Sequence, residues 1–345
     1  MQRLTRTLAA VALGAGLTAC GGETPVHEEQ FMGLGTVVSI QLAGVDEATA
    51  EEAITAIRAD LEYIEGSWYP WREGTVARNN VLLETGGEFT SSPGVLRLIE
   101  AARPLEEASD GLFNPTLARL SEAWGFHEAD PGGPPPDDET LRAIVEAEPS
   151  LADITIDGIR MQTDNSAVQL DFGGFAKGVA VDRAMDELRE RGIEDAIVNL
   201  GGDLRGTGDR GDRPWRIGIQ DPRGDGVLAS LTIEGDEAIF TSGDYERGYE
   251  HDGTYYHHIL NPRTGRPARG TASVTVIHDN GAEADAAATA LFVADAEQWP
   301  AIARAMGTEA VLRVADDGTV QLTPAMAERI AFQEAGRQHE VVELP

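Results

Sequence analysis

The sequence predicts an α+β protein with mostly antiparallel sheets and packed helices. Strand and helix patterns are interspersed along the chain, but they do not alternate strictly as they would in a doubly wound fold. No internal repeat of fixed period is found, and the low-complexity segment 130–138 contains three consecutive prolines, which require an exposed loop. The length of 345 residues is sufficient for two packed subdomains.

The N-terminal segment has the three regions of a secretory signal. Arg3 and Arg6 precede an apolar stretch, residues 8–17, that is too short to cross a bilayer. The following Leu-Thr-Ala-Cys matches the bacterial lipobox pattern, which implies cleavage before Cys20 and lipidation of this cysteine. We expect residues 1–19 to be a signal peptide and residues 20–30 a lipidated tether. The alternative is an ordinary signal peptide with a chance cysteine.

The composition excludes several function classes. Cys20 is the only cysteine, so disulfides, zinc–cysteine sites, iron–sulfur clusters and cysteine nucleophiles are excluded once it is lipidated. The formal net charge of −32 argues against nucleic-acid binding. An anionic ligand therefore needs a local basic or metal-bearing pocket that overcomes the general negative field.

The first half of the chain carries one strand pattern followed by helical patterns. Residues 35–43 alternate and are rich in β-branched side chains, which predicts a strand. Asp46 then caps a stretch whose apolar residues recur at helical spacing, which predicts a core-facing helix. Further helices are expected over about residues 94–109 and 139–147. The apolar stripe of the first helix is Ile54, Ile57, Leu61 and Ile64.

From residue 154 the pattern changes to short strands. The expected strands cover about residues 154–157, 159–163, 166–172, 195–199, 215–220, 228–234, 238–241 and 271–278. The expected helices cover about residues 175–191, 282–293 and 296–306.

Lys177 is the single lysine of the chain, whose other 26 basic residues are arginines. It lies in the segment 171–178, where glycines let the backbone approach a ligand and an apolar run begins a helix. A compact ammonium suits a role that a planar guanidinium cannot fill. The segment therefore points to a phosphate site. The alternative is a helix-start lysine left by a composition biased toward arginine.

Four other segments are rich in glycine and polar residues that a core does not require. Taken one at a time, each is a weak signal that could mark an ordinary turn. The segments are residues 109–116, 199–203, 241–245 and 256–267.

Asp285 and Thr289 lie four residues apart at the start of a predicted helix and so share one face. Both offer hard oxygen atoms suited to Mg²⁺, which takes one or two carboxylates and completes its shell with water and phosphate oxygens. The alternative is an ordinary first-turn acid favoured by the helix dipole. Together with Lys177 and glycine-rich backbone donors, the pair points to phosphoryl transfer.

In chain order, these segments resemble the FAD:protein FMN transferase family, the ApbE-type flavin transferases. The resemblance implies a single flavin transferase domain over residues 31–345, with two intimately associated subdomains and the flavin site between them. It implies Mg²⁺-dependent cleavage of FAD, transfer of the FMN moiety to a Thr or Ser hydroxyl of a partner protein, and release of AMP. The matching residues are Gly35, Thr36, 109–111, 124–126, 171–178, 199–203, 242–245, 258–265, Asp285 and Thr289.

The resemblance also assigns the metal and the chemistry by position. Lys177 would neutralise the pyrophosphate, and Asp285 would be essential to catalysis. His258 would lie near the scissile phosphate as a general base for the incoming hydroxyl. The implied metal ligands are the side chains of Asp285 and Thr289 and the main-chain carbonyls near Gly174 and Ala288.

The implied flavin-binding residues lie in several segments. Asp171 would line the flavin pocket, and either Tyr69 or Trp71 would supply a stacking face. His257 is expected to be a solvent-facing strand residue. The full set implied for flavin binding is Leu34, Tyr69, Ser109, Asp110, Gly111, Asp171, Lys177 and His258.

The chain departs from the family pattern at three positions. Leu34 replaces a methionine, which conserves volume in an apolar wall. Asn114 and Asn261 each replace an aspartate, which preserves shape but removes a negative charge.

The resemblance implies FAD and an acceptor protein as partners, with the acceptor hydroxyl in an exposed Ser/Thr motif of a membrane redox complex subunit. By family habit the lipid anchor would sit in the inner membrane, facing the periplasm. Three alternatives stay open: an Mg²⁺-dependent FAD pyrophosphatase, a non-enzymatic FAD-binding lipoprotein, and a solute-binding lipoprotein with an unrelated pocket.

Overall fold

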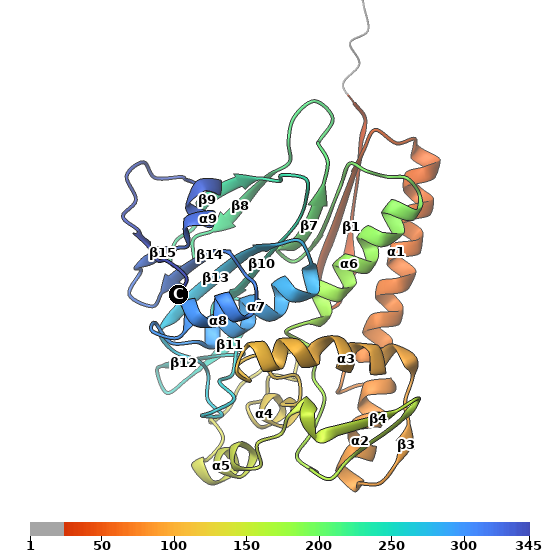
Figure 1. The fold of residues 1–345 in the computed structure, drawn as a ribbon, viewed down its shortest axis with the longest axis vertical. Helices are drawn as coiled ribbons and strands as arrows, with labels where there is room; N and C mark the ends of the chain where they lie inside the picture. The colour runs from red at the N-terminus through yellow and green to blue at the C-terminus, as the bar shows by residue number, and fades with distance from the viewer. Residues whose placement is uncertain (1–23) are drawn as a thin grey trace, which may run out of the picture.

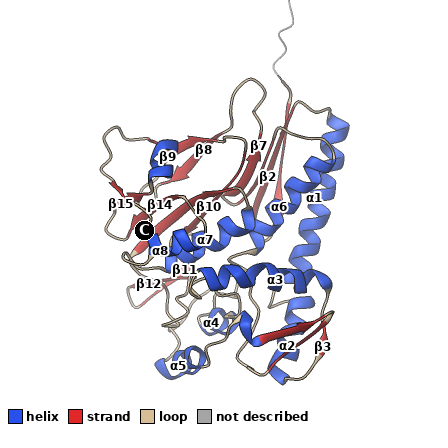
Figure 2. Cartoon of the chain, in the orientation of Figure 1, coloured by secondary structure: helices blue, strands red, loops and turns tan. Residues whose placement is uncertain are grey.

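The computed structural model describes residues 24–345, so the expected signal peptide and Cys20 lie outside the described residues. Within this range the main element is a nine-stranded sheet (Figures 1 and 2). In spatial order its strands are β1 (Val26–Gly33), β2 (Thr36–Ala43), β6 (Ala196–Leu200), β7 (Asp203–Thr207), β10 (Asp236–Gly243), β13 (Thr271–His278), β14 (Ala310–Ala315), β15 (Val320–Leu322) and β17 (Glu340–Val341). Neighbouring strands are antiparallel, except that β15 and β17 are parallel.

Helices cover one face of this sheet (Figure 1). They are α1 (Glu47–Trp68), α6 (Ala176–Glu190), α7 (Gly281–Val293) and α8 (Trp299–Ala305). α1 begins after Asp46, whose carboxylate accepts the backbone N–H of Thr49 at 3.0 Å. The predicted apolar stripe of α1 is buried in one core with alternate residues of β2, which confirms the expected helix.

The opposite face of the sheet carries a second, smaller sheet. Its strands are β8 (Arg216–Gln220), β9 (Val227–Thr232) and β16 (Ala331–Phe332), and α9 (Pro324–Arg329) packs beside them. Trp215 and Leu228 of this layer share an apolar core with Ile239 of β10, whereas the next residue, Phe240, belongs to the core under the helices. Because successive strand residues point to opposite faces, the two layers lie on opposite sides of the main sheet.

A smaller lobe packs against the helical face, at the bottom of Figure 1. It contains α2 (Thr75–Thr85), β3 (Phe89–Thr90), α3 (Pro93–Ala108), α4 (Ala118–Ala123), α5 (Asp138–Glu146), a short 3₁₀ helix (Leu151–Asp153), β4 (Ile154–Asp157) and β5 (Arg160–Thr163). Ile99 of α3 lies in the same core as α1 and α7. The hairpin of β11 (Gly248–His251) and β12 (Thr254–His257) contacts this lobe. The ring of its Tyr256 packs against Trp124 at a tilt of 39°, with ring centroids 5.2 Å apart. The two lobes are therefore intimately associated, and the expected α+β class is confirmed.

The structure corrects the predicted elements at several places. The helix expected at 296–306 begins only at Trp299, and strands β7, β14 and β15 of the main sheet were not expected. β1 begins at Val26, so residues 26–30, expected in the tether, belong to the sheet. Residues 166–172 form no strand, and an isolated bridge at Gln169 is the only ladder contact there. This segment is held by the Asn80 side chain, whose Oδ1 accepts the Leu170 N–H at 2.7 Å, and by backbone hydrogen bonds of Gln169 and Asp171 to residues 115–118.

α2 does not follow from the apolar pattern, because two of its core-facing positions hold asparagine. Asn79 donates to the hydroxyl of Ser91 at 2.6 Å, and Asn80 donates to the Leu170 carbonyl at 2.9 Å. Buried amides are tolerated here because each finds a partner from another segment. The expected helices at 175–191 and 282–293 are confirmed, with ends that differ by one residue.

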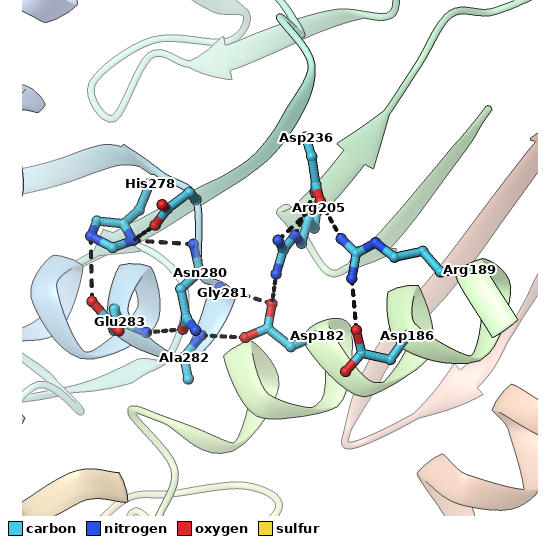
Figure 3. A network of polar contacts seen from close by, with 11 residues as sticks. Asp182, Asp186, Arg189, Arg205, Asp236, His278, Asn280, Gly281, Ala282 and Glu283 are labelled. Carbon is cyan, nitrogen blue, oxygen red and sulfur yellow. Dashed lines mark hydrogen bonds and ion pairs between the residues drawn. The ribbon is translucent and has the colours of Figure 1, made fainter. Parts of the chain in front are cut away.

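The N-terminus of α7 is held by a carboxylate on α6. Asp182 accepts the backbone N–H groups of Gly281 at 2.9 Å and Ala282 at 3.0 Å (Figure 3). Arg205 of β7 pairs with the same carboxylate and with Asp236, where its Nε donates to Oδ1 at 2.7 Å. The network fixes α7 against α6 and the sheet, because it satisfies amides that a helix N-terminus leaves without partners.

We expect Asp182→Ala to lower the free energy of unfolding by about 2–4 kcal/mol, because α7 loses two amide partners and Arg205 loses one of its two carboxylates. Asp186→Ala is the matched control, since Asp186 lies on the same helix and, within residues 24–345, forms an exposed ion pair with Arg189. Urea unfolding of both variants measures the difference. Equal losses in the two variants would contradict a bracing role for Asp182.

Candidate active site

The crossing of α6 and α7 brings Asp285 close to the N-terminus of α6. Gly178 allows this approach, because a Cβ at this position would lie 2.2 Å from the carbonyl oxygen of Gly281. At this short separation the Gly178 N–H donates to Asp285 Oδ2 at 2.9 Å. The buried carboxylate of Asp285 on α7 is thus joined to the first turn of α6.

Thr289 lies one turn after Asp285 on α7 and faces Gly174. A Cβ at Gly174 would come within 3.0 Å of the Thr289 hydroxyl oxygen, so glycine leaves room at this point. The structure therefore brings Gly174, Asp285 and Thr289 together, and Ala288 precedes Thr289 in the same helix turn.

This donor set fits Mg²⁺ better than a transition metal. Its side chains are a carboxylate and a hydroxyl, both hard oxygen donors. Residues 24–345 contain no group of three or more His, Cys, Asp or Glu side chains arranged to hold a metal ion. A metal at this position would consequently take most of its remaining ligands from water or from phosphate oxygens, as Mg²⁺ commonly does.

Lys177 forms an ion pair with Asp203, the last residue of the predicted segment 199–203, to which the sequence assigned no individual role. Asp203 begins β7 and its side chain is 5% exposed, against 27% for Lys177. Its second oxygen, Oδ1, accepts the Thr241 N–H at 2.9 Å. The sequence signal for Asp203 was its position at the end of the glycine-rich segment 199–203. Its partner Lys177 lies 26 residues away in the sequence.

The charges around Lys177 are predominantly negative. Burial lowers the pKa of Lys177, but the nearby carboxylates of Asp203, Asp285 and Glu246 outweigh it and raise the pKa above the ordinary lysine value. Burial raises the pKa of Asp285 to about 7, against the opposing effect of Lys177. Desolvation likewise raises the pKa of Glu246 to about 7. Three carboxylates around one ammonium favour a second cation at this place.

His258 lies beside this cluster with one ring nitrogen fixed. Its Nδ1 lies 3.1 Å from the carbonyl oxygen of Arg247. Because a carbonyl can only accept, Nδ1 carries the proton and Nε2 keeps a free lone pair. Burial lowers the pKa of His258 to about 4; the hydrogen bond to the Arg247 carbonyl opposes this shift, and the charges of His257, Lys177 and Arg247 add to it. At neutral pH the ring is therefore uncharged and able to accept a proton.

The expectation that His257 faces solvent is wrong. Its side chain is 3% exposed, its Nε2 lies 2.8 Å from the Ala268 carbonyl oxygen, and its ring meets Phe292 edge to face. His257 is the last residue of β12, and His258 follows the strand in a bend. His257 is thus a core residue.

Lowering the pH from 7.5 to 4.5 should reduce the free energy of unfolding by about 2–3 kcal/mol through His258 alone. The sign follows because the folded pKa, about 4, lies below the ordinary value of 6.5. Between these values the unfolded state binds more protons, so stability falls as pH falls.

Urea unfolding of the wild type and of His258→Gln at both pH values isolates this contribution, since all other titrating groups are common to the two proteins. The two proteins should lose different amounts of stability on acidification. Identical losses would mean that His258 titrates alike in the folded and unfolded states.

Asp171 lies at the entry to α6 with both carboxylate oxygens in use. Oδ1 accepts the Gly173 N–H at 2.9 Å, and Oδ2 accepts the Ser121 hydroxyl at 3.2 Å. Burial raises the pKa of Asp171. The carboxylate therefore joins the small lobe, through Ser121 of α4, to the loop that precedes Lys177.

Ser109, Asp110 and Gly111, the three predicted residues of the turn after α3, lie in different environments. Ser109 is fully buried and its hydroxyl donates to the Glu106 carbonyl at 2.9 Å, so its side chain holds the turn and cannot reach a ligand. Asp110 and Gly111 both adopt positive φ, 55° and 73°, which turns the backbone outward. Asp110 pairs with Arg263, so this turn contacts the segment that carries His258.

Leu34 and Tyr69 lie apart from the Lys177 cluster. Leu34, at the tip of the β1–β2 hairpin, has φ of 50° and donates its N–H to Glu65 at 3.2 Å. The Tyr69 hydroxyl donates to the His127 carbonyl at 3.2 Å, and its ring meets Trp71 edge to face. Among residues 24–345 no hydrogen bond or ion pair joins either residue directly to Lys177.

The two asparagines that depart from the family pattern hold turns. The side-chain oxygen of Asn114 accepts the Thr116 N–H at 2.9 Å, and its amide donates to the Pro149 carbonyl at 2.9 Å. An aspartate could make the first bond but not the second, because a carboxylate has no donor. Asn261 accepts the Arg263 N–H at 2.8 Å.

Comparisons with known proteins agree with this fold. The chain matches the ApbE family over residues 34–312. An FAD:protein FMN transferase of Rhodobacter capsulatus is 40% identical over 343 residues, which cover 97% of this chain and 66% of that relative's length. An FAD:protein FMN transferase of Vibrio cholerae is 34% identical over 320 residues, which cover 89% of this chain and 94% of that protein.

Solved structures are similar over most of the chain. The ApbE protein of Thermotoga maritima has a TM-score of 0.80 at 32% identity and covers 88% of this chain and 99% of its own. The apo form of the flavinyl transferase ApbE from Pseudomonas stutzeri has a TM-score of 0.79 at 31% identity and covers 90% of this chain and 98% of its own.

Proposed function

Because the chain belongs to the ApbE family, we propose that it is an Mg²⁺-dependent FAD:protein FMN transferase. It binds FAD, transfers the FMN moiety to a Thr or Ser hydroxyl of an acceptor protein, and releases AMP. The observation that carries this proposal is the meeting of Asp285, Thr289 and Lys177 at the crossing of α6 and α7.

The reaction exchanges one phosphorus–oxygen bond for another. The acceptor oxygen attacks the phosphorus of the FMN half of FAD, the bridging bond of the pyrophosphate breaks, and AMP leaves with the bridging oxygen. Asp285, Thr289 and the carbonyls near Gly174 and Ala288 would hold Mg²⁺, which would supply positive charge for the phosphate oxygens.

Lys177 binds and orients the pyrophosphate. Its ammonium is charged at neutral pH, and Asp203 holds it beside the Asp285 carboxylate. A charged donor that is already placed stabilises the charge that builds up on phosphate oxygens without rearranging first.

His258 takes the proton of the acceptor hydroxyl at Nε2. The Arg247 carbonyl keeps the proton of the neutral ring on Nδ1, so the Nε2 lone pair is directed away from that contact. Once protonated, the ring can return the proton to the departing phosphate.

The flavin and adenine groups occupy the junction of the two lobes. Asp171, together with the outward-turned backbone of Asp110 and Gly111, offers polar contacts there. Leu34 supplies an apolar wall and Tyr69 a ring for stacking. Ser109 supports this surface from beneath.

The protein acts at a membrane facing the periplasm, tethered by a lipid on Cys20, and its acceptors are subunits of membrane redox complexes. Among residues 24–345 no helix is long and apolar enough to span a membrane.

The decisive experiment incubates the chain from residue 21 onward with FAD and Mg²⁺, with and without a flavin-acceptor domain, and follows the products by mass. This variant keeps every helix and strand of the fold, since β1 starts at Val26. An acceptor heavier by one FMN, with AMP released, supports the transferase. Free FMN and AMP without acceptor labelling would indicate a pyrophosphatase, and FAD binding without cleavage would indicate a carrier.

A further inference from the structure

A groove lies between the main sheet and the β8–β9 layer, on the face opposite to α6 and α7. Its volume is about 480 Å³. The floor comes from β1, β2, β6 and β7 and is mixed. Ser39 and Asn199 stand opposite each other in register and Gln41 follows on the same face, beside the apolar Ile197 and Leu204. One wall comes from the loop before β8 and from β8 itself.

This wall concentrates positive charge in a strongly acidic protein. Arg210, Arg213 and Arg216 line the groove, and Glu28 is the single acid among the lining residues. Within residues 24–345 none of the three guanidinium groups has a carboxylate within 4.0 Å. The net charge of the whole chain is −32, so a groove lined by three arginines and one acid differs from the general negative field, although Asp209 and Asp212 flank Arg210 and Arg213 in the sequence.

The arginines are also short of hydrogen-bond partners. The Nε–H group of Arg210 is buried, and it donates no hydrogen bond within the described part of the chain. Arg216 is held in place by the Ser230 hydroxyl, to which its Nη2 donates at 2.8 Å and its Nε at 3.3 Å, and this leaves Nη1 open within residues 24–345. A guanidinium group with free N–H donors binds a carboxylate through two parallel hydrogen bonds.

The groove connects two distinct regions of the molecule. One end reaches Asn199 and Gly202, next to Asp203, the partner of Lys177. At the other end the loop packs on the start of the described chain, since a Cβ at Gly211 would lie 2.7 Å from Thr24. An occupant of the groove would therefore lie along the strands, with one end at the β6–β7 turn that precedes Asp203.

We propose that this groove binds an acidic peptide segment of the acceptor protein. The inference rests on the proposed function, because that function requires a protein acceptor. The arginine wall pairs with the acidic side chains, and the amides and hydroxyls of the floor bind an extended peptide backbone. A flat membrane surface could reach the arginine loop but could not enter a concave groove as far as Asn199.

Fluorescence anisotropy with a labelled peptide of alternating Asp, Glu and Ser tests this directly, using the chain from residue 21 onward. We expect salt-sensitive binding that Arg213→Gln/Arg216→Gln weakens at least about tenfold. The matched control is Arg142→Gln/Arg304→Gln, which removes the same charge from two exposed arginines outside the groove and should change the affinity less than about twofold. A peptide with Gln in place of each acid should not bind.

Two further measurements separate the alternatives. With an acceptor domain, the groove variant should show a raised KM for acceptor and an unchanged KM for FAD. Peptide binding that is insensitive to the two arginines overturns the proposal, and so does arginine-dependent binding to phosphatidylglycerol vesicles in place of peptide. A wild-type chain that transfers no FMN refutes the proposed function, whereas arginine-dependent peptide binding would still support an acidic ligand for the groove.

Discussion

Asp285→Asn should lower the kcat of FMN transfer by at least about 10³-fold while FAD remains bound. The amide oxygen can still accept the Gly178 N–H, which lies 2.9 Å from the carboxylate, so the crossing of α6 and α7 is kept. What is lost is the single buried carboxylate of the metal-binding set. Steady-state kinetics and FAD titration measure the two quantities separately.

The same substitution should not destabilise the protein at pH 8. Burial raises the folded pKa of Asp285 to about 7, so the ionised carboxylate costs stability above that pH, and asparagine removes this cost. Mg²⁺ should raise the Tm of the wild type but not that of the variant.

Glu283→Gln is the control for Asp285→Asn, because it removes one charge from the exposed side of the first turn of α7. It should retain transfer activity and the Mg²⁺-dependent rise in Tm. Full Mg²⁺-dependent turnover by Asp285→Asn would show that the metal is held elsewhere.

Lys177→Met should lower kcat/KM for FMN transfer by about 10²–10³-fold, because the pyrophosphate loses its fixed ammonium. It should also reduce the free energy of unfolding by about 1–3 kcal/mol, since the largely buried Asp203 loses its ion-pair partner. The effect on stability and the effect on catalysis therefore need separate controls.

The double variant Lys177→Met/Asp203→Asn separates the two effects. Asparagine at position 203 can still accept the Thr241 N–H at Oδ1 and carries no charge that needs a partner. We expect urea unfolding to show most of the stability restored while transfer stays impaired. If activity returned together with stability, Lys177 would be a structural residue and not a ligand of the pyrophosphate.

Local patterns in the sequence predicted much of the fold. The helix after Asp46 followed from apolar residues at helical spacing and a capping carboxylate, and both features are found in α1. β13 followed from a run of β-branched residues. β1 escaped prediction because it is an edge strand whose Glu28 and Gln30 point to solvent, so its composition is that of a tether.

The candidate site was predicted in part. The composition drew attention to Lys177, and helical spacing placed Asp285 and Thr289 on one face of α7. Asp203 was missed because an ion pair between distant segments leaves no local pattern. Ser109 was expected to contact the flavin, and His257 was expected to face solvent. Both side chains are buried and hydrogen-bonded to backbone carbonyls, so both residues are structural.

The sequence by itself thus determined the α+β class, most helices, the single lysine and the oxygen donors on α7, because each depends on residue types or spacings within a few turns of chain. Only the tertiary structure decided which polar groups meet. The contact of Gly178 with Gly281 sets the distance between α6 and α7, and that distance places Asp285 beside Lys177. Likewise, only the folding of the β8 layer against the main sheet places Arg210 and Arg213 along one groove with Ser39 and Asn199. Packing between distant segments is the physical cause in both cases, and a local pattern carries no record of it.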